Sequence, residues 1–205
     1  MIADYESRHV QDSSEWMLCP KTFNLICSVL GVPEIDLFAS RISHQVPKYF
    51  AWKLDPYSVG RDAFQTKWTH LKGYAFPPFS LMGRVLRKVE LDQATIVVVA
   101  PVWQGQPWFP KLLQLAVRNP ILLPFRKDLL KNPKGEDHPL LVNSNLRLAA
   151  WLVSGNRDLV LDYQKVLPNL LSSPAGKVQG LVTRQPGQSG LAGVRKDRLI
   201  LFDVL

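Results

Sequence analysis

Three short groups of residues with chemically useful side chains each stand at the end of an apolar run of the sequence. They are Asp36 to Ser40, Phe76 to Ser80 and Ala100 to Trp103. A carboxylate at the end of a strand, such as Asp36, can hold the amine or ribose of a cofactor through a charge-assisted hydrogen bond. A helix N-cap or a loop salt bridge is a simpler explanation of Asp36, so both interpretations stay open.

The second group places two prolines between two aromatic residues, in the order Phe76-Pro77-Pro78-Phe79. Proline fixes the backbone angle φ and removes a hydrogen-bond donor, and Phe79 offers an aromatic face. This turn can therefore form a rigid wall on which a flat base stacks. A plain turn between a strand and a helix explains the same residues equally well.

The elements that must position these groups are predicted to alternate between strands and helices. Apolar runs predict buried strands over residues 35–38, 74–76, 94–100 and 121–123. Apolar residues at helical spacing predict helices from Pro20, after Ser80 and over residues 108–117. This order predicts an α/β fold, with a mostly parallel sheet and helices on both faces, over residues 16–126. Ligands in such sheets bind beyond the carboxyl ends of the strands, where all three groups should meet.

The segments on either side of this unit are predicted to lie outside it. Residues 1–15 are interpreted as a leader and residues 127–143 as a polar linker. Residues 144–171 are predicted to be helical, because Leu146, Ala149, Ala150 and Val153 have helical spacing. Residues 172–205 are predicted to be a flexible tail, in which the glycines of residues 187–193 suit a linker better than a phosphate loop.

The charge of the chain favours a polyanionic partner. Its 25 Lys and Arg against 17 Asp and Glu give a net charge of +8. Residues 1–75 are balanced, with eight basic and eight acidic side chains, while residues 76–139 have nine against five and residues 140–205 eight against four. The pattern predicts DNA binding that is indifferent to sequence and weakened by salt.

Several other classes of protein are not expected. No apolar run approaches the roughly 18–20 residues of a membrane span, so no membrane partner is expected. The polar start of the chain does not resemble a secretory signal, which predicts an intracellular protein of the nucleus or cytoplasm. The two cysteines, Cys19 and Cys27, fit neither a disulfide framework nor a zinc site, and the four histidines are scattered, so no metal site is predicted.

A series of short motifs runs in unbroken order through residues 15–126. It comprises Glu15-Trp16, Pro20, Ile35 to Ser40, Tyr49-Phe50, Asp62-Ala63-Phe64, Trp68, Phe76 to Ser80, Val97 to Pro101 and Trp108-Phe109. The series resembles the phage-type DNA adenine methyltransferases. The segments IDLFAS, YAFPPF and APVWQGQPWFP are still more similar to the methyltransferase-like domain of DIRS-type (tyrosine recombinase) retroelements. ADYESR, at residues 3–8, resembles the end of their RNase H domain, and LRLAAWLVSG, at residues 146–155, the segment that follows.

The resemblance implies a seven-strand Rossmann-like fold that binds S-adenosylmethionine and holds a flipped adenine over the Pro-Pro turn. It implies cofactor-binding positions at Asp36, Phe38, Ser40 and Asp62 and a catalytic turn at Phe76, Pro77, Pro78 and Phe79. The related enzymes begin this turn with Asn, Asp or Ser, whose oxygen accepts a hydrogen bond from the adenine amine. Phe76 has no acceptor, so catalysis is expected to be impaired. Ala39 and Ser40 also replace glycines that are usual in the cofactor loop.

Three functional interpretations stay open. The first is a catalytically impaired methyltransferase-like domain within a polyprotein that also contains reverse transcriptase and RNase H, with DNA and flanking domains as partners. The second is an active enzyme in which another acceptor replaces the missing one. The third is a non-enzymatic module that binds nucleic acid or separates RNase H from the recombinase. The sequence gives no indication of the oligomeric state.

Overall fold

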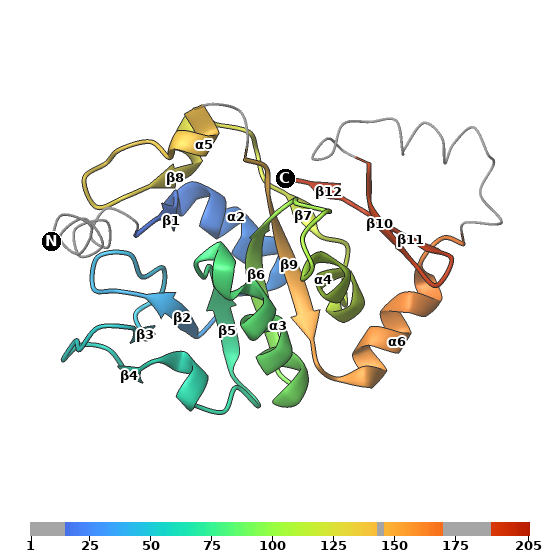
Figure 1. Cartoon of the computed structure of the whole chain (residues 1–205), viewed down its shortest axis with the longest axis horizontal. Coiled ribbons are helices and arrows are strands. Elements are labelled where there is room, and N and C mark those ends of the chain that lie inside the picture. Colours follow the sequence, from blue (N-terminus) through green and yellow to red (C-terminus); the bar gives the residue numbers. More distant parts are fainter. Residues whose placement is uncertain (1–14, 143–145, 170–189) are drawn as a thin grey trace, which may run out of the picture.

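An eight-stranded sheet forms the centre of the molecule (Figure 1). The computed structural model describes residues 15–142, 146–169 and 190–205. The strands lie in the order β12-β7-β9-β6-β5-β2-β3-β4. Their bounds are β2 Ile35–Ala39, β3 Tyr49–Ala51, β4 Gly60–Arg61, β5 Lys72–Ala75, β6 Thr95–Pro101, β7 Ile121–Leu122, β9 Leu148–Ser154 and β12 Asp203–Val204. Only β9 runs antiparallel to its neighbours in this sheet, so the predicted mostly parallel α/β fold is confirmed.

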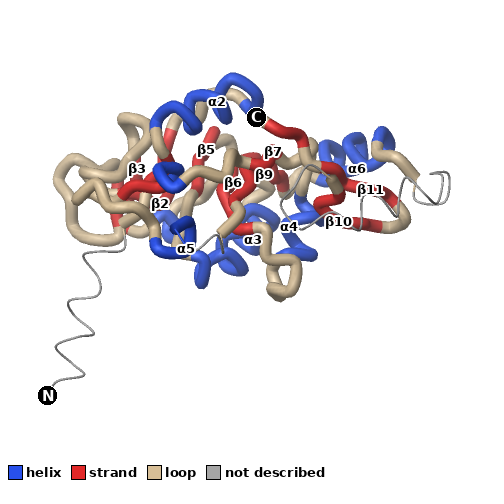
Figure 2. The backbone as a smooth tube through the Cα atoms, turned by 90° about the horizontal axis from the view of Figure 1, so that it is seen from above, coloured by secondary structure: helices blue, strands red, loops and turns tan. Residues whose placement is uncertain are grey.

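Helices cover both faces of the sheet (Figure 2). The helices are α2 Pro20–Leu30, α3 Met82–Leu91, α4 Phe109–Leu115, α5 Pro139–Val142 and α6 Arg157–Val166. Side chains alternate across a strand, and β6 therefore has two apolar faces. Val97 and Val99 pack in one core with Phe23 and Ile26 of α2. The opposite core contains Ile96, Val98 and Ala100 of β6 with Val85 and Leu86 of α3 and Leu112 of α4.

The strand order defines the place where a ligand is expected. From β2 the chain moves outward to β3 and β4, then returns to the other side of β2 for β5 and β6. Apart from the inserted β9, this is the Rossmann order, and its direction reverses between β2 and β5. The crevice beyond the carboxyl ends of these two strands is the usual ligand site of open α/β sheets.

The helix predicted from Leu146 to Val153 is wrong, because this segment forms β9. Six of its seven residues are buried, and it lies between β6 and β7. A strand that is covered on both faces has no polar alternation, so a short apolar run of this kind cannot be distinguished from a buried helix by its spacing. The later part of residues 144–171, the segment predicted to be helical, does contain a helix, α6.

The α/β unit also extends beyond residue 126, contrary to the predicted boundary. The segment interpreted as a linker contains β8, Leu130–Lys131, which pairs with β1, Met17–Leu18. The segment interpreted as a flexible tail contains the β10–β11 hairpin, Leu191–Arg195 and Arg198–Leu201, and then β12. Residues 1–14 and 170–189 lie outside the described part of the chain.

Gly193, in the stretch predicted to be a linker, has a packing role. An added Cβ at this position would lie 2.4 Å from Leu113 Cδ1 of α4. The glycine therefore allows β10 to pack closely on α4, and it does not mark a flexible linker. Among the described residues, no helix is long and apolar enough to span a bilayer. Both cysteines are free, and Cys27 is buried.

Candidate functional site

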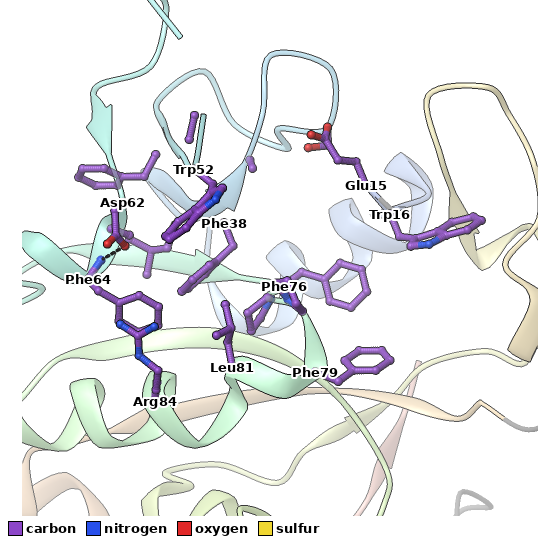
Figure 3. A pocket seen from close by; sticks show the side chains of 18 of the residues that line it. Glu15, Trp16, Phe38, Trp52, Asp62, Phe64, Phe76, Phe79, Leu81 and Arg84 are labelled. Atoms are coloured by element: carbon purple, nitrogen blue, oxygen red, sulfur yellow. Dashed lines mark hydrogen bonds between the residues drawn. The ribbon is translucent and has the colours of Figure 1, made fainter. Parts of the chain in front are cut away.

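A cavity of about 530 Å³ lies beyond the carboxyl ends of β2 and β5 (Figure 3). Its lining includes Leu37 to Ala39 at the end of β2 and Phe76 to Phe79 after β5. Ligand pockets typically have volumes of about 300–1,000 Å³. The cavity therefore has both the position and the size that the fold predicts for a ligand of nucleoside dimensions.

Aromatic side chains form two walls of this cavity. On one side, the ring centroids of Phe38 and Phe64 are 5.3 Å apart, and the guanidinium carbon of Arg84 lies 4.1 Å from the centre of the Phe64 ring. On the other side, Phe76 and Phe79 have centroids 6.2 Å apart, and Phe79 meets Trp103 edge to face at 5.1 Å. Flat apolar rings bind best between such walls.

The predicted catalytic turn lies in this lining. Phe76, Pro77, Pro78 and Phe79 all contact the cavity. The carbonyl of Pro78 accepts a hydrogen bond from the Leu81 amide at 2.8 Å, which begins the short 3₁₀ turn Phe79–Leu81 before α3. None of the four side chains can accept a hydrogen bond, so this turn can stack a base but offers it no side-chain acceptor.

Asp62 also lines the cavity, on the side of β4. The Asp62 amide donates to the Ala51 carbonyl at 3.0 Å, which continues the pairing of β3 and β4. The Asp62 Oδ1 atom accepts from the Phe64 amide at 3.1 Å. Its backbone has φ of 53°, a conformation that few residues other than glycine, asparagine and aspartate adopt. The local backbone thus holds the carboxylate at the cavity. The hydrogen bond from Phe64 uses Oδ1 and not Oδ2.

Asp36, in contrast, does not line the cavity. Its side chain is buried, and its two oxygens accept hydrogen bonds from the amides of Phe38, at 3.2 Å, and Gln45, at 3.1 Å. Burial raises the pKa of Asp36 to about 7, although both hydrogen bonds act to lower it. Asp36 is the second residue of β2, not the last, and it ties this strand to the loop that contains Gln45. The predicted direct contact between Asp36 and a cofactor is therefore not supported by this geometry.

Ser40 is also absent from the lining of the cavity. Its hydroxyl lies 3.1 Å from the hydroxyl of Ser43 and donates to the carboxylate of Glu15. Ser43 Oγ in turn accepts from the Ser40 amide at 3.0 Å. Ser40 thus positions two residues that do line the cavity, Ser43 and Glu15. Of the four predicted cofactor positions, Phe38 and Asp62 reach the cavity, while Asp36 and Ser40 support its wall.

Two segments at the ends of the predicted α/β unit complete the cavity. The first contains Glu15, the last residue of the predicted leader, and Trp16, the first residue of the predicted unit; the second contains Leu130 and His138, from the predicted linker. The rings of Trp16 and His138 are 4.6 Å apart, and burial lowers the pKa of His138. These residues are brought together by the pairing of β1 with β8, a contact across more than a hundred residues for which the sequence has no local signal.

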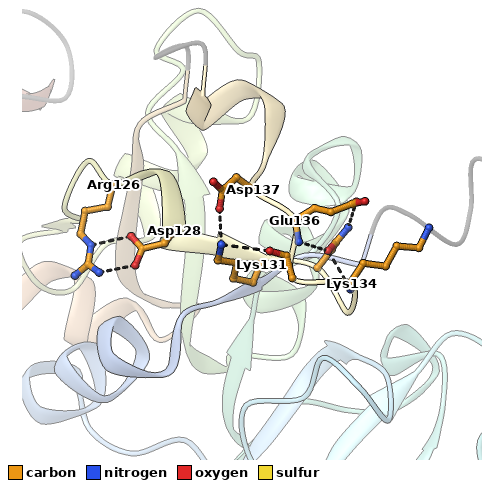
Figure 4. Close-up of polar contacts among 8 residues, drawn as sticks. Arg126, Asp128, Lys131, Lys134, Glu136 and Asp137 are labelled. Carbon is orange, nitrogen blue, oxygen red and sulfur yellow. Dashed lines mark hydrogen bonds and ion pairs between the residues drawn. The ribbon is translucent and has the colours of Figure 1, made fainter.

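Polar contacts hold the second of these segments in a defined shape (Figure 4). Arg126 forms two hydrogen bonds with Asp128, at 2.9 and 2.5 Å, and Lys131 pairs with Asp137. The Asn132 side chain donates to Glu136 at 2.7 Å and accepts from the Lys134 and Glu136 amides. The loop between β8 and His138 is therefore an ordered part of the cavity's surroundings.

The cavity combines apolar walls with a small set of polar groups. Glu15 and Asp62 supply carboxylates, and Arg84 lies against the aromatic wall. Such a site can bind a flat heterocycle between rings and a hydroxyl or amine through a carboxylate. The residues that the structure describes contain no group of three or more histidine, cysteine or carboxylate side chains that could hold a metal ion.

No family model matches the chain, and no curated protein is significantly similar to it.

Proposed function

We propose that the cavity between β2 and β5 binds S-adenosylmethionine, and that the chain is a retroelement-derived domain resembling a DNA adenine methyltransferase with impaired catalysis. The observation that carries this proposal is the position of the cavity. It lies at the point where the strand order reverses, and the FPPF turn forms one of its walls. Its place in a polyprotein with reverse transcriptase and RNase H rests on the sequence resemblance.

The residues of the cavity fit this cofactor. Phe38 and Phe64 offer an aromatic wall to an adenine ring, and the Asp62 carboxylate is suited to a ribose hydroxyl. The insertion of antiparallel β9 between β6 and β7 also agrees with the seven-strand Rossmann-like fold that the resemblance implies. When bound, this cofactor supplies an electrophilic methyl group. The residues of this chain then bind and orient it and exclude water from the aromatic walls.

Impaired catalysis follows from the turn after β5. With Phe76 as its first residue, no side chain of the FPPF turn can accept a hydrogen bond from an adenine amine. Loss of one positioned hydrogen bond at a reacting centre typically lowers the rate by about 10²–10³. Glu15 and Asp62 supply carboxylate acceptors in the lining, and either could replace the missing acceptor in the interpretation of an active enzyme.

Calorimetric titration of the full chain with S-adenosylmethionine tests the proposal. We expect saturable binding to one site. The variant Asp62→Asn keeps an acceptor for the Phe64 amide and tolerates a positive φ, but it removes the charge. We expect it to bind roughly tenfold more weakly, in the range of a hydrogen bond to a charged group.

Asp162→Asn is the matched control, because Asp162 lies on α6 and pairs there with Lys165. We expect this variant to bind like the parent chain. Absence of any saturable heat with the parent would remove the cofactor proposal and leave the non-enzymatic module. Equal weakening by both variants would show that Asp62 does not contact the ligand.

A further inference from the structure

A rim of exposed aromatic residues lies beside the cavity, on the segment that joins β3 to β4. Trp52 is 70% exposed and Tyr57 is 71% exposed. Trp52 also lines the cavity, where Figure 3 shows it beside Phe38. Tyrosine and tryptophan are enriched at binding surfaces, because each combines a large apolar ring with a polar group that can stay in water. We refer to residues 52–59, with Arg41 and Arg61, as the aromatic rim.

An arginine contacts each of the two aromatic residues of the rim, at the ring of Tyr57 and at the backbone of Trp52. The guanidinium carbon of Arg41 lies 4.2 Å from the centre of the Tyr57 ring, on one of its faces. Arg61 Nε donates to the Trp52 carbonyl at 3.3 Å. Because Tyr57 is so exposed with one face under Arg41, its other face is open to solvent. The rim thus presents rings and cations side by side.

The rim is held in shape by one carboxylate. Asp55 accepts hydrogen bonds from the Tyr57 amide at 3.0 Å and from the Tyr49 hydroxyl at 2.8 Å, and it pairs with Arg41 at 3.4 Å. These contacts, first the Tyr57 amide and then the Tyr49 hydroxyl, lower the pKa of Asp55. The carboxylate therefore stays charged, and the rings are ordered before any partner arrives, which lowers the entropic cost of binding.

The charge of the rim is positive, although the first third of the chain is neutral. The aromatic rim contains three basic side chains, Arg41, Lys53 and Arg61, against the single acidic Asp55, a local balance of +2. Among the acids that balance them in the sequence, Asp36 is buried and Asp62 lines the cavity. Partners that complement this surface are therefore negatively charged.

We infer that the aromatic rim binds single-stranded nucleic acid, with bases stacked on Trp52 and Tyr57 and phosphates against Arg41 and Arg61. Bases offer faces to both rings, and the phosphates complement the local positive charge, as in other surfaces that bind single strands. Duplex bases are already stacked on one another, so a duplex cannot use the rings in this way.

A protein partner is the competing occupant, because Leu54 and Val59 are also exposed, at 88% and 51%. Tyrosine, tryptophan and arginine are enriched in protein interfaces as well, so these residue types alone do not choose the partner. The net positive charge of the aromatic rim, with Lys53 among its apolar side chains, favours the polyanion.

Fluorescence anisotropy with a labelled oligothymidine of about 12 nucleotides tests this inference on the full chain. We expect binding that weakens as salt rises from about 50 to about 200 mM, and that is tighter than binding to a duplex of the same length. Trp52→Ala and Tyr57→Ala should each weaken it by about tenfold, the size of one lost stacking contact. Trp52→Phe and Tyr57→Phe keep a ring and should retain most of the affinity.

Phe125→Ala is the matched control. Phe125 is 38% exposed and lies under the guanidinium of Arg147, at 4.2 Å, but it follows β7, which four strands separate from β3. We expect no change in affinity. Equal binding of duplex and single strand, or unchanged affinity in both rim variants, would overturn the inference, and self-association lost in Trp52→Ala would point to a protein partner instead.

The inference goes beyond the cofactor site and does not require it. Titrations with oligothymidine and with S-adenosylmethionine use different ligands and different variants, so either can fail alone. If the chain binds the oligonucleotide but not S-adenosylmethionine, the inference about the aromatic rim is supported and the methyltransferase-like proposal is rejected.

Discussion

The two loops that flank the switch point differ in their chemistry. The loop after β2 is polar: Ser40 and Ser43 hydrogen-bond each other, Ser40 also holds Glu15, and the Gln45 amide of this loop donates to Asp36 of β2. The turn after β5 consists of two phenylalanines and two prolines, none of which has a polar side-chain atom. Both loops line or support the same cavity.

The two loops therefore differ in what they can contribute: both can help to bind a ligand, but the turn after β5 has no side chain that could activate it. The hydrogen bonds at the polar loop after β2 stabilise the wall of the cavity, because they fix the positions of Phe38 and Glu15. The apolar turn after β5 contributes rings and no acceptor. A cavity of this kind retains the architecture for binding, while the side of it that would activate a base lacks the necessary atom.

The largest expected effect concerns Asp36, at the base of the polar loop. Burial raises the pKa of this carboxyl to about 7, so the folded chain binds a proton between about pH 4 and pH 7 that the unfolded chain does not. The free energy of unfolding should therefore fall as the pH rises through this window, by up to about 1.4 kcal/mol per pH unit. Urea unfolding at several pH values measures this slope.

Asp36→Asn isolates the contribution of this group. The variant cannot ionise, so its free energy of unfolding should lose this slope, while its amide oxygen still accepts one of the two hydrogen bonds. The titratable neighbours Tyr74 and Cys27 stay neutral in the window, because burial raises the pKa of both. An unchanged slope in Asp36→Asn would show that Asp36 stays charged when folded.

Asp36 also shows how far the sequence could predict the site. The sequence around an aspartate in a strand is the same whether its carboxylate contacts a ligand or accepts hydrogen bonds from two nearby backbone amides. The choice depends on the return of Gln45 to the strand end, which is a contact between residues that no periodicity connects. Phe38, Asp62 and the FPPF turn were placed correctly at the cavity, because each lies at a strand end or just above one.

The fold was predictable where segments have a clear local pattern. The strands β2, β5, β6 and β7 and the helices α2 to α4 follow from apolar runs and helical spacing. The strands β3 and β4 were not predicted, because they are short and lie in a segment with many loop residues. β9 was predicted as a helix because its run LAAWLVS is buried on both faces, and β1, β8 and β12 have only two residues each and no apolar run that marks them. Consequently, the sequence alone did not predict that Glu15 and His138 line the same side of the cavity.

The next effect concerns the apolar turn. In Phe76→Asn an amide oxygen replaces the ring at the first position of the turn. If the cofactor is bound and an adenine stacks on the turn, the methyl-transfer rate on DNA should rise by about 10²–10³ over a parent rate near background. Transfer of a labelled methyl group to DNA measures both rates.

Phe79→Asn is the control for this gain, because Phe79 lines the same cavity but stands at the other end of the turn. It should not raise the rate. Robust methylation by the parent chain would show that another acceptor, such as Glu15 or Asp62, replaces the missing one. The two loops would then differ in the shape of the wall that each forms, while the cavity as a whole would be catalytically competent.

The smallest expected effects compare one residue from each loop. Ser40→Ala removes the hydroxyl that holds Glu15 and lies 3.1 Å from Ser43 Oγ. A typical hydrogen bond contributes about 1 kcal/mol, so the variant should lose roughly that much stability and bind S-adenosylmethionine a few-fold more weakly, because Glu15 is no longer fixed at the cavity.

Pro78→Ala should lower the free energy of unfolding by about 0.4–1 kcal/mol through the greater freedom of the unfolded chain, since φ of −48° at Pro78 is already near the value that proline imposes. The Pro78 carbonyl still accepts from the Leu81 amide in this variant, and the wall of the cavity keeps its shape. Cofactor affinity should therefore stay unchanged. Urea unfolding and calorimetry on both variants separate the two effects, and a loss of affinity in Pro78→Ala that matches Ser40→Ala would mean that the apolar turn holds the ligand as much as the polar loop does.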